Sequence, residues 1–200
     1  MKLLVNLSAW CYRAVTLPVL LFALIIFMFF MVIVLPSMSG QLSGLTGAAV
    51  SPDTSFIYSA GDLYNMAEAY GETGRSYYIY QRFTFDLAWP AVYLLFYVAV
   101  LTALFRVLPG GHLLRLANLF PFGGALFDLL ENISAALVMY RYPRVSPVAA
   151  NLAPLFTVTK WVLIAASSLA VLVGIFIAIS AYVKEKKKQI YRSESSNQIE

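Results

Sequence analysis

Two carboxyls and an amide lie within a mostly apolar stretch at residues 123–140, which reads GGALFDLLENISAALVMY. They are Asp128, Glu131 and Asn132. A spacing of i, i+3 and i+4 places them on one side of a helix. Grouped in this way, two carboxyls and an amide can hold a proton, bind a cation or accept hydrogen bonds from a ligand. The stretch therefore predicts a polar face turned away from lipid.

In apolar surroundings these acids carry a large free-energy cost when they are ionised. An ionised acid at the centre of a bilayer costs about 2.5–3.5 kcal/mol on insertion scales. Two carboxyls on Cβ atoms about 5–6 Å apart also repel each other, so either one is protonated or a cation lies beside them. Lys160, in the next apolar run, is the expected partner of Glu131. Asp86 and Arg82, at the outer end of another apolar run, are expected to join the same cluster.

Buried acid–base pairs can also do no more than hold helices in register. That structural alternative needs one acid for each base, whereas Asp128, Glu131 and Asn132 form a richer group. Ionisable residues inside a membrane are by default candidates for a functional site. The hypothesis is therefore a ligand-binding cluster, and the pattern assigns no catalytic residue.

The composition identifies the surroundings as a membrane. The 200-residue chain is 60% hydrophobic and 12% charged, whereas soluble domains are about 45–50% apolar and about 25% charged. The apolar residues form long runs, which is typical of an integral membrane protein. The net charge of +4 gathers largely in KEKKK at 184–188, directly after such a run. This placement favours a cytoplasmic membrane flank and argues against nucleic-acid binding.

Two single residues exclude several classes of chemistry. Cys11 is the only cysteine, so one chain cannot form an internal disulfide, a redox pair or a thiolate metal cage. His112 is the only histidine, which excludes bis-histidine haem and the usual zinc sites in a monomer. We expect no metal and no cofactor.

Four apolar runs reach the length of about 20 residues that a spanning helix needs. They lie at about 15–36, 87–106, 121–140 and 155–183. The sequence thus predicts an all-α membrane protein, with one four-transmembrane-helix bundle over residues 1–183. The basic tail at 184–200 is expected to be disordered.

The third run is too long for a single straight span. Its 29 residues, 112–140, would extend about 43 Å as a helix, against a hydrocarbon core of about 30 Å. Pro121, followed by two glycines, offers a break. We expect 112–119 to form a short interfacial helix and the span to begin at 121.

The distribution of Lys and Arg predicts that both termini lie inside. This orientation gives the cytoplasm most of the basic residues: Lys2, Arg13, Arg106, Arg115 and those of the tail. The long segment 37–86 then lies outside. We expect the protein to be a multi-pass protein of the cell (inner) membrane.

The outer segment has three parts. Its first part is a Gly- and Ser-rich loop, and its second, SAGDLYNMAEAYG at 59–71, carries apolar residues at helical spacing. We expect an amphipathic helix there. The third part, at 77–93, is rich in aromatic residues, which is typical of an interfacial belt. The alternative interpretation is an aromatic-lined vestibule for a ligand.

A small residue recurs at every fourth position of the fourth run. These residues are Ala166, Ala170, Gly174 and Ala178. Such a ridge allows another helix to approach closely, so we predict a helix-packing face.

Three functions are compatible with these features. The first is a membrane-embedded binding or accessory protein, whose polar cluster forms the floor of a site for a lipid or an amphiphile. The second is a small proton- or cation-coupled transporter, formed by several copies. The third is an intramembrane isomerase or hydrolase that uses a carboxyl of the cluster as general acid–base. Expected partners are membrane lipids, the ligand, and a second copy or another membrane protein.

Overall fold

The computed structural model describes residues 2–37, 52 and 55–197, and every regular element among them is a helix. Most of the predicted Gly- and Ser-rich loop lies outside the described residues. The expected all-α class is confirmed.

The chain begins with two helices that meet at a sharp corner. The first, α1 (Lys2–Ala14), is followed after two residues by α2 (Leu17–Phe29). Pro18 lies in the first turn of α2, where its missing N–H costs no helical hydrogen bond. The helix continues as a π-helical turn, η1 (Phe30–Val34). Together these elements cover the first predicted span.

Two short helices precede the second span. The first, α4 (Ala60–Ala69), falls where the amphipathic helix is predicted. A capping box starts it, in which Ser59 N donates to Asp62 Oδ2 at 2.8 Å and Asp62 N donates to Ser59 Oγ at 3.2 Å. Gly71, with a φ of +61°, turns the chain into α5 (Gly71–Arg82). The sequence interpretation did not include this second helix.

The remaining helices form the main body. α6 (Phe85–Leu104) ends in a 3₁₀ turn, η3 (Phe105–Val107). A second 3₁₀ helix, η4 (Leu113–Leu119), leads into α7 (Phe120–Arg141), which has Pro121 in its first turn. A short helical element thus lies where the sequence places it, but it runs directly into α7, and the two form one helical segment, Leu113–Arg141. The last helix, α8, runs over Pro147–Asn197.

Four helical segments are long and apolar enough to cross a membrane. They are Leu17–Ser37, Gly71–Val107, Leu113–Arg141 and Pro147–Gln189. The most apolar window of α8 is only 11% buried by the protein itself, and that of the first segment only 6%. Apolar surface left exposed on this scale is what a lipid-facing helix requires. The structure supports a membrane protein with four spans.

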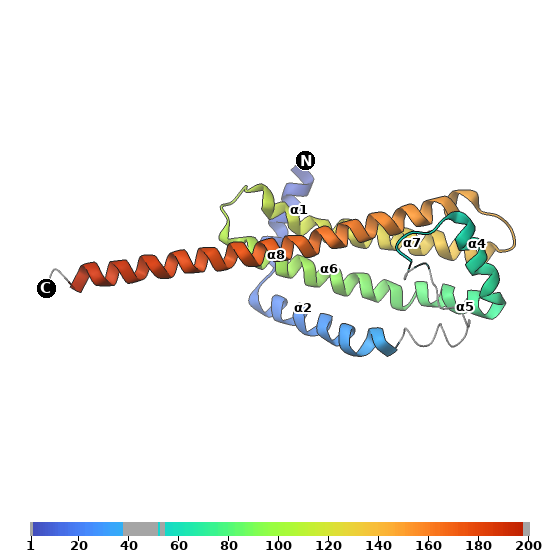
Figure 1. Ribbon diagram of the computed structural model, residues 1–200, viewed down its shortest axis with the longest axis horizontal. Coiled ribbons are helices and arrows are strands. Elements are labelled where there is room, and N and C mark those ends of the chain that lie inside the picture. The colour runs from blue at the N-terminus through green and yellow to red at the C-terminus, as the bar shows by residue number, and fades with distance from the viewer. Residues whose placement is uncertain (1, 38–51, 53–54, 198–200) are drawn as a thin grey trace.

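The helices α6, α7 and α8 lie side by side, and α2 packs against the outer flank of α6 (Figure 1). The contact between α2 and α6 is aromatic, with the ring centroids of Phe27 and Phe96 3.9 Å apart. At one end of the bundle α1 lies crosswise, and α4 and α5 cover the other end (Figure 1). Because α2 is peripheral, the interior of the bundle belongs to α5–α8.

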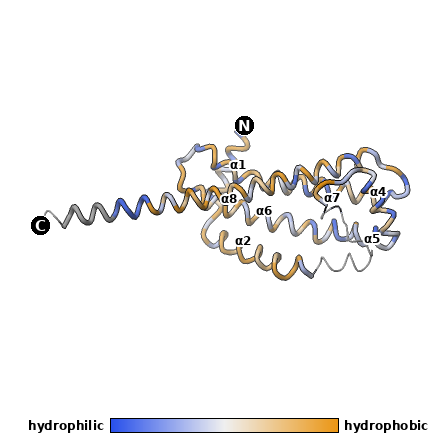
Figure 2. Tube along the Cα trace, in the orientation of Figure 1, coloured by the Kyte–Doolittle hydropathy of each residue, from blue (hydrophilic) through white to orange (hydrophobic). Residues whose placement is uncertain are grey.

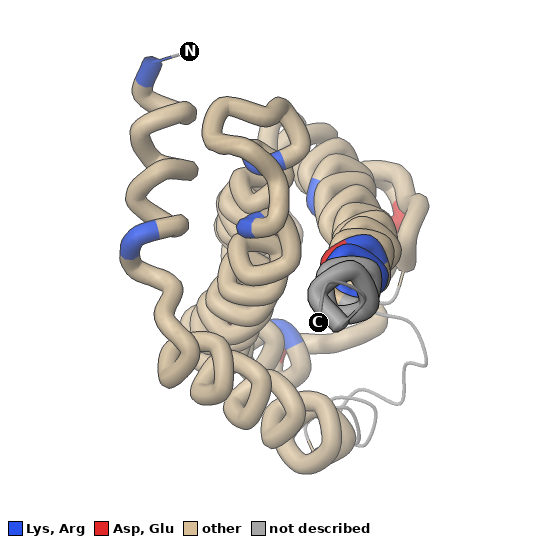
Figure 3. Tube along the Cα trace, turned by 90° about the vertical axis from the view of Figure 1, so that its left-hand side faces the viewer, with Lys and Arg blue, Asp and Glu red and all other residues tan. Residues whose placement is uncertain are grey.

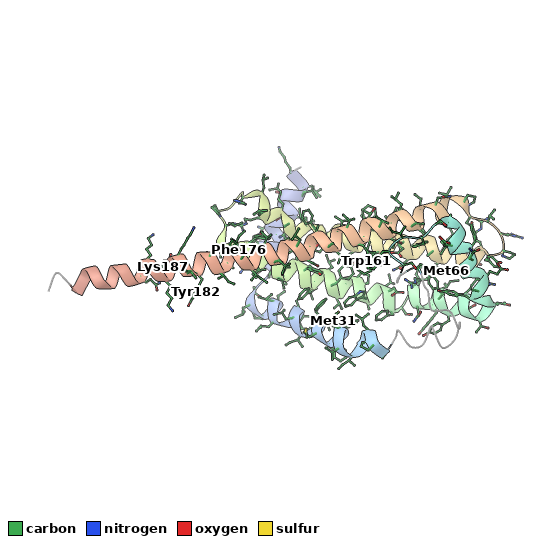
Figure 4. The ribbon with its side chains drawn as sticks, in the orientation of Figure 1. Met31, Met66, Trp161, Phe176, Tyr182 and Lys187 are labelled. Atoms are coloured by element: carbon green, nitrogen blue, oxygen red, sulfur yellow. The ribbon has the colours of Figure 1, made fainter. Side chains whose placement is uncertain are left out.

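The C-terminal part of α8 extends well beyond the other helices. Figure 4 shows Tyr182 and Lys187 on this extension. The basic segment 184–188 forms its hydrophilic stretch (Figure 2). The sequence predicts disorder for residues 184–200, whereas α8 continues as a helix to Asn197. Lys and Glu are good helix formers, so this segment can extend a helix already nucleated by the span.

Candidate functional site

The three polar residues of α7 face the interior of the bundle. Glu131 and Asn132 are each 1% exposed and Asp128 is 6% exposed. Close packing on the same face is possible because Gly124 has no side chain: a Cβ there would lie 3.5 Å from Ile164 and 3.9 Å from Tyr93. Glu131 is the twelfth of the 22 residues of α7, so the cluster lies about halfway along this span.

Lys160 reaches the acids from the neighbouring helix α8. Its ammonium nitrogen lies 2.5 Å from Oε2 of Glu131 and 3.3 Å from Oδ1 of Asp128. Lys160 is itself only 4% exposed. In such poorly solvated surroundings the attraction between charges is much stronger than in water. One lysine therefore bridges both acids of α7.

A second ion pair comes from the junction of α5 and α6. Nε of Arg82, the last residue of α5, lies 3.2 Å from Oδ2 of Asp86 in the first turn of α6. Asn132 joins this pair to α7, since its Oδ1 accepts from Nη1 of Arg82 at 3.1 Å and its Nδ2 donates to the backbone oxygen of Asp86 at 3.1 Å. The six predicted cluster residues thus form two contact groups, Lys160 with Asp128 and Glu131, and Arg82 with Asp86 and Asn132. The two groups lie side by side because Glu131 and Asn132 are consecutive residues of α7.

Tyrosines that the sequence interpretation did not single out complete the network. The hydroxyl of Tyr93 on α6 donates to Oδ2 of Asp128 at 3.0 Å. The guanidinium of Arg82 lies over the ring of Tyr78, 4.3 Å from its centroid. Both tyrosines belong to the aromatic segment 77–93, and both are buried. The only signal in the sequence is their position one or two turns from Arg82 and Asp86.

The second oxygen of Glu131, Oε1, has no hydrogen-bond partner within the described part of the chain. Thr157 on α8 is a hydroxyl neighbour of this carboxyl, but it donates to the backbone oxygen of Ala153 at 3.0 Å. Burial raises the pKa of Tyr58, so its phenol stays protonated and can donate to Thr157 at 3.0 Å. While the Thr157 hydroxyl points to Ala153, Oε1 of Glu131 is left without a donor, and rotation of that hydroxyl toward Glu131 would supply one.

The charges of the cluster do not balance. Asp86, Asp128 and Glu131 face the two bases Arg82 and Lys160, which leaves one negative charge in excess when all five are ionised. The Asp86 side chain is 17% exposed, more than the side chains of the other four. Any proton or ligand that balances the cluster thus has its most open approach beside Asp86.

The aromatic segment 77–93 does not behave as one unit. Tyr80 and Phe83 are 63% and 50% exposed, as in an interfacial belt. Trp89 stacks on Phe30 with ring centroids 6.2 Å apart. Tyr78 and Tyr93 belong instead to the polar cluster. The stretch thus contains aromatic residues of three kinds: some are exposed, some pack against other rings, and some contact the polar cluster.

The small-residue ridge of α8 has mixed surroundings. A Cβ on Gly174 would lie 3.0 Å from Cβ of Leu104, so α6 approaches closely there. Ala166 and Ala170 instead line an open apolar groove of about 300 Å³ together with residues of η3, η4 and α7. Ala178 is half-buried. A close helix contact is therefore present at Gly174, whereas Ala166 and Ala170 border a groove.

Ser167, two turns after Lys160 on α8, is also buried, and its hydroxyl donates to the backbone oxygen of Leu163 in its own helix at 2.8 Å. Within the described residues, no group of three His, Cys, Asp or Glu side chains is arranged to hold a metal ion.

Comparison with known proteins adds no assignment: no protein family matches the chain, and neither a curated protein nor a solved structure resembles it.

Proposed function

We propose that this protein is a multi-pass protein of the cell (inner) membrane that binds a lipid or amphiphile through a cationic group at the polar cluster. In this proposal both termini lie in the cytoplasm and the protein acts as a binding or accessory subunit. The observation that carries the proposal is a buried cluster of three carboxyls and only two bases, in which Oε1 of Glu131 has no hydrogen-bond partner among the described residues.

The chemistry of the ligand follows from what the cluster lacks. An ammonium group would supply the missing positive charge, and its N–H groups would bond the free carboxyl oxygen. Asp86 offers the first contact because it is the most exposed acid of the cluster. Phe85 and Trp89, on the same helix as Asp86, each stack on Phe30, and aromatic rings attract cations. The hydrocarbon part of an amphiphile would remain in the bilayer.

Proton- or cation-coupled transport is the second candidate. It is favoured by the surplus of one carboxyl over the bases in the cluster, and by the interruption of the helix between α5 and α6 next to the cluster. Interrupted helices beside buried charges are common in the ion and substrate sites of transporters. In this case a proton or a small cation would balance the excess charge, and it would be carried across the membrane.

A binding experiment with the full-length protein in lipid nanodiscs tests the proposal. The probes are three fluorescent amphiphiles with the same alkyl chain and a primary ammonium, a zwitterionic or a sulfonate headgroup. We expect the ammonium probe to bind most tightly, and Glu131→Gln and Asp86→Asn each to weaken it about tenfold or more. The matched control is Glu72→Gln, which removes an exposed acid of α5 outside the cluster.

Equal binding of the ammonium and sulfonate probes by a folded protein would show that the cluster only holds helices together. Acidification of proteoliposomes driven by a cation gradient, abolished by Glu131→Gln, would favour transport instead.

A further inference from the structure

The helix α1 lies crosswise at the end of the bundle from which the extension of α8 emerges. Two views agree on this arrangement, one from the side (Figure 1) and one along the bundle (Figure 3). The helix is joined to the first span, α2, through only Val15 and Thr16. It is thus held near the level at which the spans leave the membrane.

One face of α1 is fixed to the bundle. Ser8 Oγ and the hydroxyl of Tyr12 both donate to the backbone oxygen of Arg115 in η4, each at 3.3 Å. The guanidinium of Arg115 in turn covers the ring of Tyr12, 3.8 Å from its centroid. Cys11 on the same face is 1% exposed.

Arg106 of η3 also donates to the backbone oxygens of Tyr12 and Val15, at the C-terminal end of α1. These contacts come from two separate elements. The crosswise position of α1 is therefore part of the fold.

A second face of α1 is apolar and open. It consists of Leu3, Leu7, Trp10 and Ala14, at the spacing i, i+4, i+7 and i+11 that aligns residues along a helix. Leu3 is 76% exposed and Trp10 is 56% exposed. Leu7 and Ala14 are half-buried, so Leu3 and Trp10 form the open part of this row. Large apolar side chains left open in this way indicate contact with something other than water.

The third face is polar and basic. Lys2, Asn6 and Arg13 lie on it, all exposed, and α1 contains no acid. An apolar row beside a basic row, with a tryptophan at the boundary, is the pattern of a helix that lies in a membrane interface. Figure 3 shows basic positions on α1 and on the extension of α8, both at the end that faces the viewer.

We propose that α1 is an interfacial helix that inserts its Leu3–Trp10 row among the acyl chains and binds anionic phospholipid headgroups through Lys2 and Arg13. The occupant of the open face is thus the lipid of the leaflet at this end. Lys2 and Arg13 favour anionic lipids in that leaflet, because basic side chains next to a membrane surface attract anionic headgroups. This role is separate from the polar cluster and does not depend on its ligand.

Spin labelling of the full-length protein in nanodiscs tests the proposal. A label is placed at Trp10→Cys or Asn6→Cys in a Cys11→Ala background, and its collisions with oxygen and with a nickel chelate are compared. The lipid is phosphatidylcholine with or without phosphatidylglycerol. Reference labels are Leu169→Cys on the exposed apolar side of α8 and Lys187→Cys on its polar extension.

We expect the label at position 10 to behave like that at position 169, with oxygen favoured, and the label at position 6 to collide more with the nickel chelate. Phosphatidylglycerol should increase the immersion depth of the label at position 10 when Lys2 and Arg13 are intact. This increase should be lost in the double variant Lys2→Gln/Arg13→Gln. Arg141→Gln/Arg144→Gln removes the same charge at the opposite end of the bundle and should leave the effect intact.

Three outcomes would overturn the proposal. A label at position 10 that reaches the nickel chelate as freely as position 187 would mean that α1 stands in water. Protection from both reagents would mean that a protein covers this face. An immersion depth that does not change with phosphatidylglycerol would refute the binding of anionic headgroups.

Discussion

Lys160 of α8 lies 2.5 Å from Glu131 of α7, and the side chains are only 6% and 1% exposed. The pair joins the two helices that make the most extensive contact in the bundle. Its energy therefore depends on both partners being present, because either one alone would be a buried and unpaired charge.

Replacement of the lysine should be costly. Lys160→Met leaves Asp128 and Glu131 without their shared cation, and we expect a loss of about 3–5 kcal/mol of stability at neutral pH. The measurement is the thermal unfolding temperature in detergent as a function of pH. Addition of Glu131→Gln should restore part of the loss, and acidification should do the same by neutralising the acids. Lys184→Met, an exposed control on the same helix, should have little effect; an equal loss there would contradict the prediction.

The hydroxyl of Tyr93 should stabilise the cluster. Tyr93→Phe removes the donor to Oδ2 of Asp128 and leaves the ring in place, so we expect a loss of about 1–3 kcal/mol. Tyr97→Phe is the matched control, since its hydroxyl pairs with Ser168 in a less buried position on the same helix. Thermal unfolding of the two variants should rank Tyr93→Phe as the more damaging, and the reverse order would refute the assignment.

The close approach at Gly174 should not tolerate a side chain. Gly174→Leu forces the new atoms against Leu104 and Phe105, and overpacking of this kind typically costs about 1–3 kcal/mol. Ala165→Leu adds a similar bulk at an exposed position of the same helix. Unfolding temperatures in detergent should fall only for the first variant. Equal effects would mean that the glycine faces lipid.

Acid should loosen the start of α4. Hydrogen bonds from the backbone and side chain of Ser59 lower the pKa of Asp62, so the cap is stabilising when the carboxyl is ionised. This contribution is complete above the ordinary aspartate pKa of about 3.9 and is lost as the pH falls through the lower folded value. Amide exchange at Asp62 and Leu63, corrected for the intrinsic rate, should therefore speed up in acid. Asp62→Asn should exchange faster at all pH values and lack this transition.

The proposed orientation has a direct test. Single cysteines at Ala60 and Lys188, in a Cys11→Ala background, are exposed to an impermeant thiol reagent in intact cells. We expect labelling at position 60 alone, because the Lys and Arg distribution favours cytoplasmic termini. Labelling at position 188 alone would invert the topology.

The main parts of the cluster could be predicted because helical periodicity acts on residues that have few alternatives in a membrane. Asp128, Glu131 and Asn132 share a face through their spacing alone, and no lipid-facing position would accept them. Lys160 could be matched to them by depth, since each residue of a helix adds about 1.5 Å along the axis. Arg82 and Asp86 also follow from the need of buried charges for partners.

Tyr78 and Tyr93 could not be found in this way. A tyrosine has an apolar ring and a polar tip, so it suits an interface and a buried polar contact equally well. Their sequence positions carry no periodic signal that separates the two cases. The helix α5 could not be predicted for a related reason, since its aromatic residues are also typical of an interfacial belt. The face of α1 becomes visible only when its contacts with η4 are known.

The turn between α7 and α8 has a consequence for how the chain enters the bilayer. Only residues 142–146 separate these helices, so the acids of one and the lysine of the other belong to a single hairpin. If each helix were inserted alone, it would carry uncompensated charge into hydrocarbon. As a hairpin, the lysine enters together with the two acids and compensates one of them. The short turn therefore lowers the barrier to membrane insertion for the most polar part of the protein.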